Sequence, residues 1–209
     1  MIRHTLHMEF NVTMASSSAL ESSEEKTNGF KLMRLIVDGG TEVLRNVFMS
    51  KHSGNLHTVL STHYATLDHL FQKRIITEPQ WDKLYPHPPQ IPNIQEFDIT
   101  LLVILLRNMC GIPPPSTGWN VLPNDSDTSC AANIVRIRLF RNDFAHSKET
   151  GVSATEFETV WNDVSSALVG LGFSQAEIDR LKEEECGEEE SKGSQQAPVN
   201  GSSNKSRNG

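Results

Sequence analysis

The sequence predicts an all-α helical bundle, and three observations lead to this fold class. Apolar residues recur at three- and four-residue spacing in nearly every central segment, and no segment alternates with the two-residue period of a strand. Only 37% of the 209 residues are apolar, which is below the usual share for a compact domain. The polar ends account for this deficit. We therefore expect one helical domain at residues 29–182 between disordered tails at 1–28 and 183–209.

Two helical segments open the predicted domain. Within residues 31–51 the apolar side chains lie on one face, and Gly39-Gly40 is the expected break or bend. Within residues 55–72 a second set of apolar side chains forms one stripe, which predicts a further helix. Each segment can bury its apolar stripe only by packing it against a neighbouring helix.

The next two helices are marked by the residues at which they begin. Thr77 and Gln80 have the spacing of a capping box, in which each side chain bonds the other residue's backbone. A run of prolines at 86–92 then separates this helix from the next one. Asp98 caps a segment that is apolar on all sides as far as Cys110, which predicts a buried central helix.

A long loop follows, and it leads into a further helix. Three prolines at 113–115 begin the loop, which contains Trp119. Ser126 or Asp127 is expected to cap the helix, because both side chains accept hydrogen bonds from a free helix N-terminus. The apolar pattern of this helix continues to about Phe144.

Two capping boxes mark the last helices of the domain. The first begins at Ser153 and precedes the cleanest amphipathic pattern in the chain, with Trp161 in the middle of its apolar stripe. We expect Trp161 to be largely buried. The second box begins at Ser174 and starts a short helix that ends in a run of glutamates.

The charge of the chain lies mostly in the predicted tails. The net charge is −7; residues 1–28 carry −2 and residues 183–209 carry −3, so the domain between them carries −2. A nearly neutral domain has no broad cationic surface of the kind that attracts nucleic acid or membranes. A small local basic site remains compatible with this balance.

Cysteine and histidine usage exclude several further classes. The three cysteines form no CxxC pair, no signal-peptide core is visible, and the longest apolar run is too short to cross a bilayer. We expect an intracellular, cytoplasmic protein without membrane contact. His52, His57, His63 and His69 lie five or six positions apart and share no helix face with each other, so we expect no metal and no other cofactor.

One segment near the end of a predicted helix is strongly basic. It contains His146 and four cations, namely Arg136, Arg138, Arg141 and Lys148. Arg141 and His146 are five positions apart, about 140° around a regular helix. They can converge only if the helix ends between them or a second copy of the chain contributes. The simpler interpretation is that basic groups at a helix C-terminus complement the helix dipole.

The six residues from Arg141 to His146 read Arg-Asn-Asp-Phe-Ala-His and resemble the Arg-Asn-x-x-x-His signature of the HEPN superfamily, the higher-eukaryote and prokaryote nucleotide-binding helical domains. Their surroundings resemble the HEPN domain of the DAZ-interacting zinc-finger protein three family. This resemblance spans about residues 30–173. Among the stretches that carry it are residues 97–111, Thr117-Gly-Trp119, Ile134-Val-Arg-Ile137, and Phe157-x3-Trp161 through Leu171-Gly172.

The resemblance implies a HEPN-like helical bundle that often dimerises, and active members of the superfamily are metal-independent endoribonucleases. By this likeness His146 would be the acid or base at the ribose 2′-hydroxyl or the leaving 5′-oxygen. Arg141 would neutralise the phosphate as charge builds, and Asn142 would orient the neighbouring groups or the phosphate. Histidine and arginine suit these tasks chemically. The flanking cations that we expect to bind RNA are Arg136, Arg138 and Lys148.

Two functions remain open at this point. The first is RNA binding, with possible cleavage, by a homodimer whose two copies share one site. The second is a non-catalytic HEPN interaction or dimerisation module that meets protein partners in a larger ubiquitin- or immunity-linked assembly. The cysteines of this chain could not ligate a RING finger, so ubiquitin transfer is not assigned to it. In the homodimer, the face of Ile137 and Phe144 and the loop at 113–122 are the expected contact.

Overall fold

The computed structural model of the protein describes residues 23–147 and 149–184, and these residues form helices and connecting loops without a strand. The predicted tails lie almost entirely outside this range. In chain order the elements are α1 (Glu24–Arg34), the π-helical turn η1 (Leu35–Gly39), α2 (Gly40–Ser50), α3 (Leu56–Thr62), α4 (Tyr64–Gln72), α5 (Glu78–Leu84), the 3-10 turn η2 (Ile94–Glu96), α6 (Ile99–Met109), α7 (Cys130–Ala145), α8 (Ala154–Gly170) and α9 (Gln175–Glu183).

The first helix begins within the stretch that the sequence predicted as a tail. The Ser23 side chain accepts a hydrogen bond from the Lys26 backbone N–H. Two glutamates occupy the first turn, where their negative charge interacts favourably with the positive end of the helix dipole. The turn is also tied to a distant segment, because the Val152 backbone N–H donates to the Glu25 carbonyl at 2.9 Å. The ordered domain therefore starts several residues before the predicted boundary at residue 29.

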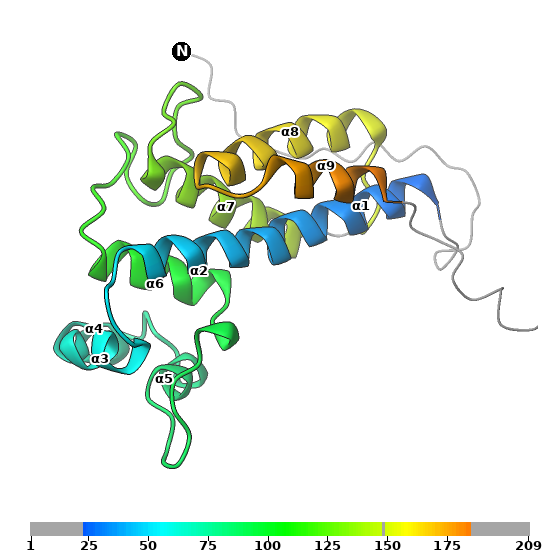
Figure 1. The fold of residues 1–209 in the computed structure, drawn as a ribbon. Helices are drawn as coiled ribbons and strands as arrows, with labels where there is room; N and C mark the ends of the chain where they lie inside the picture. Colours follow the sequence, from blue (N-terminus) through cyan, green and yellow to red (C-terminus); the bar gives the residue numbers. More distant parts are fainter. Residues whose placement is uncertain (1–22, 148, 185–209) are drawn as a thin grey trace, which may run out of the picture.

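The α1, η1 and α2 elements form one long continuous helix that crosses the molecule (Figure 1). The predicted bend at Gly39-Gly40 is absent; instead a π-helical turn at Leu35–Gly39 changes the register without interrupting the helix. The second glycine serves close packing, because a Cβ atom at Gly40 would lie 2.9 Å from the Ile137 side chain.

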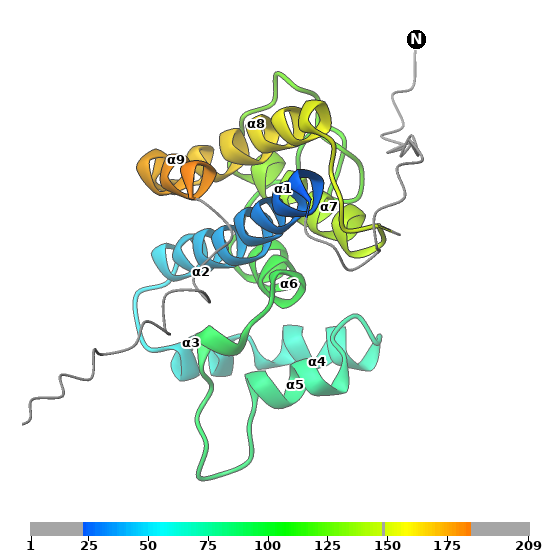
Figure 2. The same cartoon turned by 90° about the vertical axis from the view of Figure 1, so that its right-hand side faces the viewer.

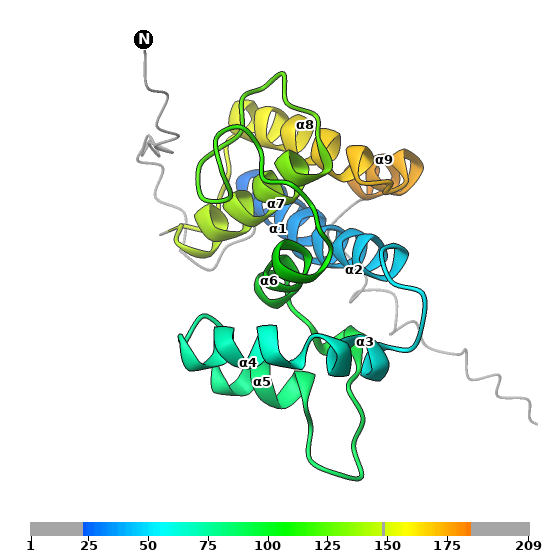
Figure 3. The same ribbon diagram turned by 90° about the vertical axis from the view of Figure 1, so that its left-hand side faces the viewer.

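The remaining helices pack on two sides of this long helix. On one side α7 and α8 pack against each other and against η1, while α8 also contacts α1 and α9. On the other side α6 packs against α2, and Figures 2 and 3 show α3, α4 and α5 as a further layer beyond α6. One hydrophobic cluster connects all of these helices, and it includes the long helix, α6, α7 and α8 as its centre.

Several predicted helix starts are confirmed. Thr77 and Gln80 form the capping box, and the Asp98 carboxylate accepts from the Leu101 backbone at 2.7 Å. Ser153 caps α8, and Trp161 in that helix is buried, with 2% of its surface exposed. Helix α9 follows Ser174, although the Ser174 side chain makes no capping hydrogen bond.

Two predicted elements were wrong in detail. The stripe at residues 55–72 is divided into α3 and α4, since His63 leaves the helical conformation between them. Helix α7 is capped by Ser129 rather than by Ser126 or Asp127, because the Asp127 carboxylate instead accepts from the Ser129 backbone and turns the chain before the helix.

Candidate functional site

Helix α7 carries the predicted motif, and about half of the helix is buried in the core. Its first half is buried on nearly all sides, and the buried residues end at Phe140. The last turn, from Arg141 onward, becomes progressively exposed. The fold therefore holds the helix rigidly by its apolar half and presents the end that contains the motif to solvent.

The structure brings two of the three predicted catalytic residues together. Arg141 is half-buried, and its guanidinium donates to the Asn142 side-chain oxygen at 3.3 Å. His146 is exposed and lies directly after the helix. Its backbone N–H still donates to the carbonyls of Asn142 and Asp143, at 3.1 and 3.2 Å. The chain therefore keeps its helical path to His146, so Arg141 and His146 remain about 140° apart around the axis.

Asp143 supplies a negative charge beside this motif. Burial raises the pKa of the Asp143 carboxyl, and the nearby His146 acts in the opposite direction. In the part of the chain that the structure describes, no carboxylate lies within 4 Å of the Arg141 guanidinium.

The predicted RNA-binding arginines of α7 support the loop that precedes the helix. The Arg136 guanidinium donates to the backbone carbonyls of Asp127 and Asn124, both at 2.7 Å. The Arg138 guanidinium donates to the Trp119 carbonyl and, at 3.4 Å, to the Asn120 side chain. Both arginines therefore have a structural role in fixing the loop. Lys148 lies outside the described residues.

A further arginine and an aromatic ring join Arg138, and sequence reasoning did not connect them. The Arg107 guanidinium, from the end of α6, lies 6.0 Å from the centre of the Trp119 ring. Burial and the like charge of Arg107 lower the pKa of Arg138. These residues are far apart in the sequence, and only the packing of α6 against α7 brings them together.

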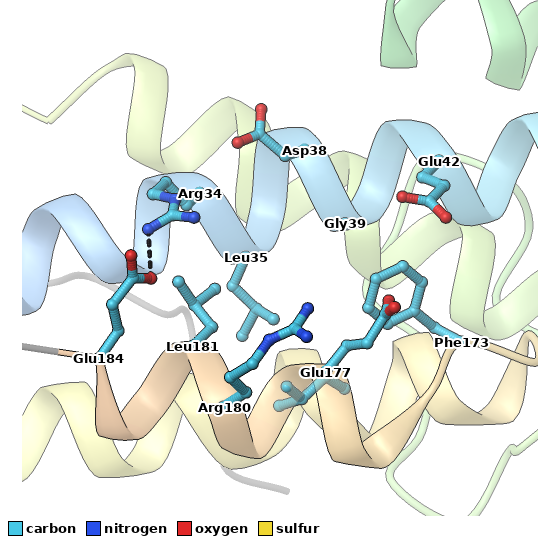
Figure 4. Close-up of a pocket in the computed structure, with 11 residues that line it drawn as sticks. Arg34, Leu35, Asp38, Gly39, Glu42, Phe173, Glu177, Arg180, Leu181 and Glu184 are labelled. Atoms are coloured by element: carbon cyan, nitrogen blue, oxygen red, sulfur yellow. Dashed lines mark hydrogen bonds and ion pairs between the residues drawn. The ribbon is translucent and has the colours of Figure 1, made fainter.

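The groove between the long helix and α9 is a poor site for an anion (Figure 4). Arg34 in this groove is paired with Glu184 at 2.5 Å, and Arg180 extends between the two helices. The carboxylates outnumber these cations; they belong to Asp38, Glu42, Glu177 and Glu184. A phosphate backbone would meet net repulsion there.

A second cleft lies between the loop at 122–128 and helices α7 and α8. Asp125, Arg136 and Asp163 line it. Burial and the neighbouring Asp125 raise the pKa of the Asp163 carboxyl, while Arg136 lowers it. Because the Arg136 guanidinium is already bonded to backbone carbonyls, this cleft offers two carboxylates and no free cation to a ligand.

One histidine–cysteine contact occurs where α2 meets α6. The His52 Nε2 atom lies 3.4 Å from the Cys110 Sγ atom, and the rings of His52 and His63 are 5.8 Å apart. Burial and His63 lower the pKa of His52, and burial raises the pKa of the Cys110 thiol to about 11. The sulfur is thus a protonated hydrogen-bonding group at neutral pH and not an activated nucleophile.

Residues 23–147 and 149–184 contain neither a metal-binding cluster nor a membrane-spanning helix. No three histidine, cysteine or carboxylate side chains gather closely enough to hold a metal ion. No helix in the same range is long and apolar enough to cross a membrane.

The expected dimer contact is wrong in one part. Ile137 is only 1% exposed and packs inside the chain against Gly40 and its neighbours. Phe144 is half-buried in a small apolar cavity that it shares with Leu32 and Val152. The apolar face of α7 is therefore used within the molecule, and only the loop at 113–122 keeps exposed apolar surface, at Val121.

Comparison with known families identifies this helical domain as a HEPN domain. Residues 53–194 match the family described as DZIP3/hRUL138-like HEPN, and the chain belongs to this family. The match begins after α2, so the long helix lies outside it although it forms part of the core.

Two curated proteins are similar to this chain. The E3 ubiquitin-protein ligase DZIP3 of Homo sapiens is 30% identical over 163 residues, and that of Mus musculus is 28% identical over 159 residues. Each alignment covers 74% of this chain but only 13% of the relative, so the chain corresponds to a small part of either protein. No solved structure matches the chain.

Proposed function

We propose that this HEPN domain binds RNA at the C-terminal end of α7 and cleaves it without a metal ion. The observation that carries the proposal is that the Arg141 and His146 side chains of the motif have no acidic partner among the residues that the structure describes. In the described residues neither the Arg141 guanidinium nor the His146 imidazole is paired with a carboxylate within 4 Å. His146 is exposed to solvent, and Arg141 is held by an amide oxygen that leaves most of its donors free.

The chemistry would be transfer of the phosphate within one ribose. The His146 imidazole takes the proton of the 2′-hydroxyl, the 2′-oxygen attacks phosphorus, and the bond from phosphorus to the 5′-oxygen breaks. A proton donated to that oxygen by an imidazole completes the step. The Arg141 guanidinium donates hydrogen bonds to the non-bridging oxygens, where negative charge builds. The products are a 2′,3′-cyclic phosphate and a 5′-hydroxyl.

We infer that two copies of the chain complete this site. The helical path continues to His146, so one chain directs Arg141 and His146 to different sides of the helix end. A two-fold axis beside the helix end would place the His146 of one copy near the Arg141 of the other. Isologous contacts of this kind are the commonest in oligomers.

Metal-free cleavage of RNA tests the catalytic proposal. The full chain is incubated with single-stranded RNA in a chelator, and the product ends are identified. We expect His146→Ala to lower the rate by about 10²–10⁴-fold, the usual effect of a positioned acid or base. His57→Ala is the matched control, since His57 is exposed on α3 away from the motif. A rate that survives His146→Ala would remove the catalytic assignment.

Complementation tests the shared site. Arg141→Ala and His146→Ala proteins should each be inactive, and a mixture of the two should recover part of the activity, because a mixed dimer contains one complete pair. Sedimentation over a concentration series gives the oligomeric state. An active wild-type monomer, with activity per chain independent of concentration, would contradict the two-copy site.

A second candidate function is a non-catalytic interaction module in a ubiquitin-linked assembly. The two relatives are E3 ubiquitin-protein ligases, which suggests such a setting. The favouring observation is a row of exposed apolar side chains on the long helix: Phe30 is 47% exposed, Met33 38% and Val37 42%. We expect Met33→Glu to abolish self-association or partner binding in this case, while the RNA assay stays negative for the wild type.

A further inference from the structure

Three side chains from separate parts of the chain form a small cationic and aromatic cluster beside the motif. Trp119 comes from the loop before α7, Arg107 from the last turn of α6 and Arg138 from the middle of α7. The Arg107 guanidinium lies over the Trp119 ring, and the Arg138 guanidinium donates to the Trp119 carbonyl. We call these three residues the Trp119 cluster.

The Trp119 cluster has an unusual electrostatic balance. Its two guanidiniums are close enough to repel each other. Within the described parts of the chain, the ion pairs are Arg34–Glu184 and Lys182–Glu158, so neither Arg107 nor Arg138 has a carboxylate partner. The Arg138 Nε atom is buried and makes no hydrogen bond. Like charges held together without a counter-ion provide a favourable place for an anion.

The Trp119 ring limits the kind of anion that would bind at the cluster. Trp119 is half-buried, and its neighbour Asn120 is exposed. An indole beside guanidiniums suits a ligand that carries a flat ring and a negative charge on the same unit. A nucleotide of a single strand meets this requirement, since its base can stack on the indole while its phosphate lies between the guanidiniums. Bases in a duplex are already stacked and are unavailable for this contact.

We propose that the Trp119 cluster is a nucleotide subsite that holds single-stranded RNA next to the α7 motif. The inference rests on the proposed function, which it extends by naming the residues that position the strand. Arg138 and His146 are eight positions apart on one helix, which is about 12 Å along its axis. A strand anchored at Trp119 therefore needs only a few nucleotides to reach His146, and Arg141 lies between the two points.

Binding to a 2′-O-methyl RNA tests this subsite apart from cleavage, because the blocked 2′-oxygen cannot attack phosphorus. Fluorescence anisotropy of a labelled oligonucleotide is measured with the full chain. We expect Trp119→Ala to weaken binding by about 5- to 150-fold, the range for loss of one stacked base, and Trp119→Phe to restore most of it. Arg107→Gln should weaken binding and reduce the slope of log affinity against log salt by about 0.7.

Arg180→Gln is the control, since Arg180 is an exposed arginine of α9 on the groove of Figure 4. Because Trp119 also packs against the core, the thermal stability of each variant is recorded, and Arg107→Gln changes only an exposed side chain. If Arg107→Gln binds like the wild type and Trp119→Ala loses nothing beyond its folded fraction, the subsite is refuted.

The outcomes separate this inference from the proposed function. Loss of cleavage in His146→Ala, together with unchanged binding by the Trp119 and Arg107 variants, would leave the proposed function standing and overturn the subsite. Weakened binding in those variants, with no cleavage by the wild type, would support the subsite and overturn catalysis. A wild-type protein that binds no RNA but captures a protein partner through this loop would overturn both.

Discussion

Arg136 and Arg138 illustrate how one residue type can serve two purposes on a single helix. Their guanidiniums fasten the loop at 119–127 by hydrogen bonds to backbone carbonyls. A planar guanidinium can donate in several directions at once, which a lysine cannot do with the same geometry. The Arg136 guanidinium is bonded to the loop and to Asn133 of its own helix, whereas Arg138 has the like-charged Arg107 as a neighbour. We therefore assign the proposed ligand contact to Arg138 and not to Arg136.

Trp161 is the clearest single-residue test of the core. Its ring is 2% exposed and packs against the Phe157 ring in the preceding turn of α8. Trp161→Ala should lower the free energy of unfolding by about 3–5 kcal/mol, the range for a large buried aromatic side chain. Urea denaturation measures this value. Val169→Ala in the same helix is the control, because Val169 is 40% exposed and should change it by less than about 0.5 kcal/mol.

The histidine beside Cys110 makes stability depend on pH. Burial and His63 lower the pKa of His52 in the folded protein below its usual 6.5. Between the usual pKa and the lowered one, His52 is protonated in the unfolded chain but neutral in the folded chain. The free energy of unfolding therefore falls as the pH decreases from 7 to 5. His52→Gln should lose less stability over this range than the wild type. His57→Gln, at an exposed histidine, should behave like the wild type; equal losses in all three proteins would refute the assignment.

At the level of helices, the sequence correctly predicted those helix starts at which a single capping residue determines where the helix begins. Thr77, Asp98 and Ser153 each cap the helix that they were expected to cap. The start of α7 was missed because several capping residues follow one another before it, and the turn made by Asp127 selects Ser129. Local patterns carry no information about which of these side chains turns the chain.

The π-helical turn and the Trp119 cluster were missed for a different reason. The cluster depends on contacts between separate segments, such as Arg107 against Trp119, and the close approach of Gly40 to Ile137 beside the π-helical turn also joins separate segments. The sequence located the Arg141–His146 motif and the end of its helix. It could not reveal that the α7 arginines are bonded to the loop, since that contact depends on how the loop folds back.

Gly29 in α1 offers a test of helix packing. Alanine is intrinsically better in a helix by about 0.5–1 kcal/mol, but a Cβ atom at Gly29 would lie 1.9 Å from the Thr150 carbonyl oxygen. Gly29→Ala should therefore lower the free energy of unfolding, by about 1–3 kcal/mol as for other overpacked sites. Gly39→Ala is the control, because its Cβ atom would lie 3.5 Å from Leu168. Calorimetry that finds Gly29→Ala as stable as the wild type would contradict this packing.

For the whole molecule, we expect the folding unit to begin earlier in the chain than the region that matches the family. The match covers residues 53–194, whereas the long helix at 24–50 supplies core side chains that include Leu32, Leu44 and Phe48. A fragment of residues 53–194 should show no cooperative thermal unfolding, while a fragment of residues 23–184 should unfold in one transition. Circular dichroism of the two fragments decides this point. Cooperative unfolding of the shorter one would make the long helix dispensable.

The long helix also sets the order of events during synthesis. Its buried face is made first, but its partners in α7 and α8 follow about 120 residues later. The Val152 backbone N–H then donates to the Glu25 carbonyl, and the Lys31 side chain donates to the Lys182 carbonyl, 151 residues further along the chain. At 5–20 residues per second the ribosome needs roughly 6–24 s to deliver them. During that interval an amphipathic helix without a partner is exposed. The nascent chain should therefore be a client for chaperones that hold apolar helices until α8 has left the ribosome.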